Sequence, residues 1–149
     1  VNGDCLEIQV EIDPKGAAEF GVKVRRSPDG EEETTIVYSP SDGFLKIDLT
    51  KSTLDDEVKY SRLTPQDEDG GERYTNSQEA PFKLVEGESL KLHIFLDRSV
   101  LEVFVNNRLC LTQRIYPTRA DSLGVSIFAH GGEAILNGLD AWTMTPTVG

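Results

Sequence analysis

The chain is poor in basic residues and lacks any long apolar run. Its 149 residues include 15 lysines and arginines against 26 aspartates and glutamates, a net charge of −11. A negative field of this size repels phosphate backbones, so we expect no nucleic-acid partner. No apolar run approaches the roughly 18 residues of a membrane-spanning helix, so we expect no membrane contact. No signal peptide is recognisable, and the start at Val1 indicates a fragment, a processed subunit or a trimmed chain.

Cysteine and histidine are also scarce. Cys5 and Cys110 fit no zinc or redox spacing, and we expect two buried or half-buried thiols. A disulfide between them requires that their strands be neighbours. His93 and His130 have no serine or cysteine nucleophile with an orienting carboxylate in a recognisable frame. Two histidines without a third ligand give little support to a metal site, so we expect no metal and no cofactor.

The segment 90–116 has the clearest strand pattern. Its first apolar residues alternate with Lys91, His93 and Phe95, as in a strand with one face on a core. A polar reversal at 97–99 leads into a β-branched and aromatic run at 100–105. Asn106-Asn107 then supplies two residues that tolerate positive φ, as a type I′ hairpin turn requires. A third strand follows through Ile115. We predict a β-meander that is central in the fold.

The remaining apolar patterns predict short strands separated by turns rich in proline and glycine. The predicted strands are 6–12, 20–24, 34–38, 44–49, 81–85, 123–129, 134–136 and 139–144. No stretch has ten residues of helical periodicity, and no linker divides the chain. We predict one all-β domain over 1–149, a two-sheet antiparallel β-sandwich of the jelly-roll or concanavalin-like kind with roughly ten strands.

Between Thr50 and Ala80 the apolar pattern fades and acidic residues gather. A long solvated loop explains this composition. A calcium loop is the alternative, since hard cations need several oxygen ligands. However, the segment Asp67 to Glu72 lacks the frame of an EF-hand loop.

Candidate catalytic carboxylates are weak. Asp13-Pro14-Lys15-Gly16 is similar to a nucleophile loop of some fructose-releasing glycosidases, but it lacks the preceding Asn and reads as a turn. Glycoside hydrolysis needs two carboxylates roughly 5 to 10 Å apart. Asp97 and Glu102 are the two within the meander; Asp97 begins a turn, and Glu102 could pair with Arg114 or Lys91. We therefore expect structural roles for both and name no catalytic residue.

Four motifs in order resemble the C-terminal domain of glycoside hydrolase family 32, the invertases, inulinases and related fructosidases. The most specific is Leu96-Asp97-Arg98-Ser99 followed by Val100-Leu101-Glu102-Val103-Phe104-Val105-Asn106. The others are the opening strand at 3–8, the Arg-Ile-Tyr-Pro segment at 114–117 with the hairpin at 124–134, and the closing strand at 139–144. Asp48-Leu49-Thr50-Lys51-Ser52 departs from a further Asp-Arg-Ser-like turn that relatives often show. The resemblance covers essentially the whole chain.

The resemblance implies an N-terminal five-bladed propeller as partner, and that propeller carries the family's catalytic motifs. We therefore expect a chain that is no enzyme on its own, that packs on the propeller and stabilises it, and whose parent hydrolyses fructosyl bonds in sucrose or fructan. The family also allows a secreted or vacuolar location.

Two sets of residues are candidates for interaction. A rival reading makes the chain a carbohydrate-binding module in which Trp142 or Tyr116 stacks on a sugar ring, although Trp142 reads more readily as core. Phe95 and Phe104 lie on the outward parity of the meander among charged residues, which is unusual for a solvated sheet face. We therefore predict that Phe95 or Phe104 lies in or beside a contact with another domain or subunit.

Overall fold

The computed structural model describes residues 2–61 and 74–145, which form twelve strands and, within these ranges, no helix. Accordingly, no helix of the described residues has the length and apolar character needed to cross a membrane. The strands are β1 (Cys5–Asp13), β2 (Glu19–Arg26), β3 (Thr34–Ser39), β4 (Phe44–Asp48), β5 (Tyr60–Ser61), β6 (Tyr74–Thr75), β7 (Ser77–Pro81), β8 (Leu90–Asp97), β9 (Val100–Val105), β10 (Leu109–Arg114), β11 (Gly124–His130) and β12 (Ile135–Thr143).

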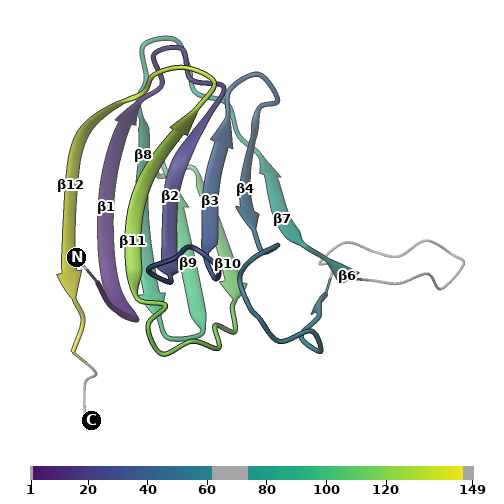
Figure 1. Ribbon diagram of the computed structural model, residues 1–149. Coiled ribbons are helices and arrows are strands. Elements are labelled where there is room, and N and C mark those ends of the chain that lie inside the picture. Colours follow the sequence, from purple (N-terminus) through teal and green to yellow (C-terminus); the bar gives the residue numbers. More distant parts are fainter. Residues whose placement is uncertain (1, 62–73, 146–149) are drawn as a thin grey trace, which may run out of the picture.

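Two five-stranded antiparallel sheets face each other, which confirms the predicted β-sandwich (Figure 1). Sheet I has the order β10-β9-β8-β1-β12, and sheet II has the order β11-β2-β3-β4-β7; β5 and β6 form a separate pair. The first and last strands of the chain lie side by side, because β1 pairs with β12. At sheet II, β11 joins the hairpin of β2 and β3.

The core lies between the sheets and is built by the alternation seen in the sequence. The inward residues of β1 and β8 are at most 3% exposed, whereas the residues between them face outward. On the side of sheet II, Phe20, Tyr38 and Phe82 pack edge to face with ring centroids 5.7 and 5.8 Å apart. The hydroxyl of Tyr38 accepts a hydrogen bond from the Leu84 backbone at 3.1 Å, so this buried polar atom is paired.

The meander is confirmed, but only its first strand is central. β8 holds the middle of sheet I, and β10 is an edge strand. Both predicted turns are present: Arg98 has φ 54°, and Asn106 and Asn107 have φ 49° and 55°, as the hairpin turn requires. Asn106 also fixes its turn, since Oδ1 accepts a hydrogen bond from the Lys91 backbone at 2.9 Å.

Several predicted boundaries are wrong. The strand predicted at 81–85 is instead β7, which ends at Pro81, because proline has no N–H for a further ladder bond. The strands predicted at 134–136 and 139–144 are one strand, β12, with an irregular register opposite Glu11 and Ile12. β5, β6 and β7 lie in the stretch predicted as a solvated loop, whereas the acidic segment Asp67–Glu72 lies outside the described residues.

The cysteine prediction holds for one thiol. Cys5 is half-buried, and its Sγ lies 3.6 Å from Oδ1 of Asp97. Burial, with Asp4 nearby, raises the pKa of this thiol. Cys110 is exposed rather than buried, because β10 is an edge strand and the side chain points to its outer face. The two cysteines are free.

A buried carboxylate connects the turn before β3 to distant loops. Glu32 is 0% exposed, and its two oxygens accept five hydrogen bonds. Four of these donors belong to residues 118–122, and the fifth is the backbone N–H of Leu54. Burial alone raises the pKa of Glu32, but the hydrogen bonds outweigh burial and the pKa is lowered. The adjacent Glu33 is also buried and pairs with Lys23 at 2.9 Å and Lys51 at 3.2 Å.

Candidate interaction surfaces

The residues considered for chemistry lie apart from one another. Glu102 is half-buried on the outer face of β9, opposite Phe95 and Thr112. The ion pairs of the described residues join it neither to Arg114 nor to Lys91. Asp13-Pro14-Lys15-Gly16 forms the predicted turn after β1. Within residues 2–61 and 74–145, no three His, Cys, Asp or Glu side chains are close enough to hold a metal ion.

The outer face of sheet I carries rows of side chains that run across its strands. Residues opposite each other in an antiparallel pair point to the same face. One row therefore contains Trp142, Glu7, Phe95, Glu102 and Thr112. The next row contains Asp140, Gln9, His93, Phe104 and Cys110. Segments far apart in the sequence thus build one surface.

Three rings of these rows form a cluster. His93 lies 4.4 Å from Phe95 between ring centroids, and Phe95 meets Phe104 edge to face at 5.9 Å. His93 also lies 2.8 Å from Oε1 of Glu7 through Nε2, a contact that orients its ring. Both phenylalanines are half-buried on the outer face, so neither belongs to the core between the sheets. Their place in an interdomain contact stays a prediction.

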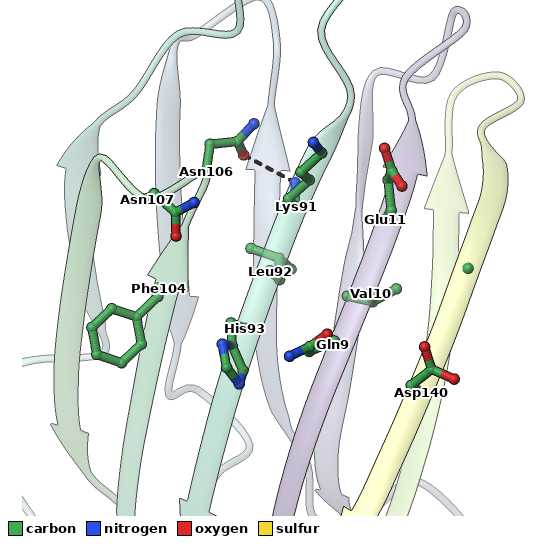
Figure 2. A pocket seen from close by; sticks show the side chains of 11 residues that line it. Gln9, Val10, Glu11, Lys91, Leu92, His93, Phe104, Asn106, Asn107 and Asp140 are labelled. Atoms are coloured by element: carbon green, nitrogen blue, oxygen red, sulfur yellow. Dashed lines mark hydrogen bonds between the residues drawn. The ribbon is translucent and has the colours of Figure 1, made fainter.

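A hollow of about 330 Å³ lies beside this cluster (Figure 2). We call it the Phe104 hollow. Its lining includes Gln9, His93, Phe104, Asn107, Gly138 and Asp140. They come from four adjacent strands and from the hairpin turn after β9. Figure 2 shows Phe104 and Asn107 on one side, with His93, Gln9 and Asp140 following across the sheet.

β12 exposes apolar side chains, including some that its register with β1 places on the inner face of sheet I. Leu139 lies opposite Val10 on the inner face, but Leu139 is 43% exposed and Val10 only 3%. Sheet II therefore covers β1 and stops short of β12, which lies at the left edge of the molecule in Figure 1. We define the β12 patch by the exposed large apolar residues of this strand: Leu136 and Leu139, which lie opposite inward residues of β1, and Ile135 and Trp142, which lie opposite outward ones.

Trp142 and Tyr116, the two sugar-stacking candidates, are in different places. Trp142 is 47% exposed, so its interpretation as a core residue is wrong: the outer parity of an edge strand leaves the indole uncovered. Tyr116 is 41% exposed and lies beyond β10, with its ring stacked on Tyr60 at 6.1 Å between centroids. The guanidinium of Arg114 lies 5.9 Å from the same ring. One face of Tyr116 is therefore occupied by the chain itself.

Leu136, Gly138 and Leu139 were not candidates from the sequence. An inward-facing leucine in an alternating strand reads as core, and nothing local marks the strand as an edge. The charge pattern also pointed away from an edge, since β12 has Asp140 as its single charged residue among nine. Edge strands normally carry charges that prevent pairing with other chains.

The comparison with known families decides the assignment. The family described as "Glycosyl hydrolases family 32 C terminal" matches residues 1–143. The chain belongs to this family. Within it, the levanase of Bacillus subtilis (strain 168) is 35% identical over 155 residues, which cover 97% of this chain and 20% of the levanase. The family 32 C-terminal domain thus spans about a fifth of that relative.

Solved structures agree on the fold of the family 32 C-terminal domain. Fructan 1-exohydrolase IIa from Cichorium intybus matches with a TM-score of 0.72 at 19% identity, covering 95% of this chain and 31% of that chain. Sheep Galectin-11 matches with a TM-score of 0.59 at 15% identity, covering 94% of this chain and 91% of that chain. At these identities the likeness shows the fold alone.

Proposed function

We propose that this chain is a non-catalytic module that packs on the catalytic domain of a β-fructofuranosidase-type glycoside hydrolase and stabilises it. The observation that carries the proposal is the uncovered β12 patch, because four large apolar side chains of one edge strand are each 43–47% exposed. Membership of the family supports the kind of partner, since the matched levanase is about five times longer than the region it shares with this chain.

The energetics favour a covered β12. Complete burial of a large apolar side chain contributes about 1.5–3 kcal/mol relative to exposure. The half that remains exposed at each of four residues therefore leaves roughly 3–6 kcal/mol to be gained by a partner. Interdomain contacts bury about 600–1,500 Å² and contain polar as well as apolar residues. The free backbone groups of the edge strand provide the polar part.

The aromatic cluster adjoins this surface. Trp142 and Phe95 belong to the same row and are separated only by Glu7. A partner that covers Trp142 therefore comes close to Phe95, in agreement with the predicted contact at or beside Phe95 or Phe104. The partner is the N-terminal propeller of the parent, which hydrolyses fructosyl bonds; the names of relatives such as "Levanase" and "Beta-fructofuranosidase 1" support this part of the proposal.

The test compares Leu139→Asp with Val85→Asp in the parent enzyme and in this chain. Both replace an exposed apolar residue by a charge, but Val85 is 66% exposed and lies outside β12. We expect Leu139→Asp to lower the thermal midpoint of the parent and to weaken association of this chain with the separately produced catalytic domain at least tenfold. Val85→Asp should change neither.

Each variant is first unfolded in urea as the isolated 149-residue chain, so that lost folding is not mistaken for lost docking. An unchanged urea midpoint with weaker association supports the proposal. Equal association of Leu139→Asp, Val85→Asp and the unchanged chain, measured by sedimentation, contradicts it.

A further inference from the structure

We propose that the Phe104 hollow is a binding site for a neutral saccharide, held by this chain itself. The hollow lies on the outer face of sheet I, whereas Leu136 and Leu139 of the β12 patch lie on the inner parity, so the inference does not depend on docking through Leu139. It places the site away from Tyr116 and beside, rather than on, Trp142, the two residues that the sequence made candidates for stacking on sugar.

Gly138 is the first observation. Glycine in the interior of a strand weakens the strand, and it often marks a β-bulge or a place where a ligand or another backbone approaches closely. The irregular register opposite Glu11 and Ile12 begins next to Gly138, but the φ of Gly138 is not positive and an added Cβ would meet nothing within 4 Å, so neither backbone conformation nor close packing requires a glycine here. The missing side chain instead leaves the end of the hollow open. Gly21 is the contrast, because its Cβ would lie 1.9 Å from the carbonyl oxygen of Ile36.

The lining has the mixed chemistry that sugars need. Phe104 provides an aromatic ring beside the hollow, suited to the apolar C–H face of a sugar ring. Gln9 and Asn107 provide amides, which both donate and accept hydrogen bonds, and Asp140 provides acceptors. Among the described residues, none of these three side chains has a hydrogen-bond or ion-pair partner within the chain, whereas the neighbouring Asn106 is hydrogen-bonded through both its oxygen and its nitrogen.

The neighbouring groups are held in place, so the site is preorganised. The ring of His93 is positioned by Glu7 at 2.8 Å. Phe104 is supported edge to face by Phe95. The backbone at Asn107 is set by the hairpin turn, with φ 55°. Binding a ligand therefore orders few further side chains, because folding has already fixed these groups.

Charge and size restrict the ligand class. Glu11 and Asp140 line the hollow against one cation, Lys91, in a chain of net charge −11, so a phosphorylated sugar is disfavoured. The volume of about 330 Å³ lies at the lower end of small-molecule sites. The row from Phe104 to Asp140 spans four strands, about 14 Å at about 4.8 Å per strand. These dimensions suit a short neutral oligosaccharide better than a single ring.

The experiment is an NMR titration of the ¹⁵N-labelled 149-residue chain with 1-kestose, sucrose and sucrose 6-phosphate. We expect saturable shifts centred on Gln9, His93, Phe104 and Asn107, with 1-kestose binding most tightly and sucrose 6-phosphate more weakly than sucrose. Gly138→Leu should fill the hollow and weaken 1-kestose binding at least tenfold.

Gly16→Leu is the matched control: Gly16 also has ordinary φ and open space around its Cβ, but it lies in the turn after β1. It should bind as the unchanged chain does. If Gly138→Leu fails to fold, Asn107→Gly keeps the positive-φ turn, removes one amide and should weaken binding several-fold. The proposal is overturned if no saturable shifts appear or if the shifts are centred on Tyr116. It is also overturned if Gly138→Leu binds 1-kestose as tightly as the unchanged chain does. Asn107→Gly takes the place of Gly138→Leu in this comparison if the latter does not fold. Docking through Leu139 is unaffected by any of these outcomes.

Discussion

Replacing Glu32 by glutamine isolates the contribution of one buried charge to the stability of the sandwich. Glutamine has nearly the same volume as glutamate, but it has one carbonyl oxygen in place of two carboxylate oxygens. In the native protein, Oε2 accepts three hydrogen bonds, from the Leu54 and Thr118 backbones and the Thr118 hydroxyl. Oε1 accepts two, from the Arg119 backbone at 3.0 Å and the Ser122 hydroxyl at 2.6 Å.

The magnitude follows from these contacts. With the glutamine oxygen at the Oε2 position, the amide nitrogen faces the backbone N–H of Arg119, and one buried donor without an acceptor costs about 1–3 kcal/mol. The three bonds at Oε2 lose their charge assistance, about 1 kcal/mol each. A neutral amide is easier to bury than a carboxylate, which offsets about 2 kcal/mol of this loss of stability. The net expected loss is on the order of 3 kcal/mol in the free energy of unfolding.

Urea unfolding followed by far-ultraviolet circular dichroism measures this loss. For a slope of about 2 kcal/mol per molar urea, the midpoint should fall by about 1.5 M. Glu31→Gln is the control, since Glu31 is exposed and its contact with Arg119 is 3.3 Å long. Surface changes of this kind stay within about 0.5 kcal/mol. If Glu32→Gln costs no more than Glu31→Gln, the five hydrogen bonds do not stabilise the fold as argued.

The pH dependence gives a second measure of the same group. The pKa of Glu32 is lower in the folded protein than its ordinary value of 4.5. The carboxylate therefore contributes its stability above that ordinary value, and the contribution is lost as the pH falls through the folded-state pKa. The difference between the native chain and Glu32→Gln should be largest above pH 5 and should shrink as the solution is acidified below the ordinary pKa.

Three further expectations concern single residues that support turns and close packing in the fold. Gly21→Ala should cost about 3 kcal/mol or more in urea unfolding, because its Cβ would lie 1.9 Å from the Ile36 carbonyl oxygen; a loss below about 1 kcal/mol contradicts the close approach. Hydrogen bonds from Arg108 lower the pKa of Glu88 to about 2. A ¹³C titration should give this pKa for Glu88 in the native chain and a pKa closer to 4.5 in the Arg108→Gln variant. An equal pKa in both would show that Arg108 is not the cause. Asn106→Ala should cost about 2 kcal/mol through two lost hydrogen bonds and strain at φ 49°, and an unchanged urea midpoint would show that the turn does not need this side chain.

Local patterns in the sequence were sufficient for the strands and for their inward faces. The alternation at Leu90–Leu96 and Leu6–Ile12 predicts which side chains are buried, because successive residues of a strand point to opposite faces. Asn106-Asn107 predicts a turn because both residues tolerate positive φ. The motif from Asp97 to Asn106 led to the family that the whole-chain comparison then established.

Tertiary structure decided which strands are neighbours and which of them are edges. Backbone hydrogen bonds between strands are nearly the same for every residue type, so the sequence did not show that β1 pairs with β8 and β12. The exposure of Leu139 and Trp142 depends on where the second sheet ends. The burial of Glu32 depends on donors 86–90 residues away, and the Phe104 hollow needs four strands in register with a glycine at one end. Each of these features arises from long-range packing, which local alternation and turn chemistry leave open.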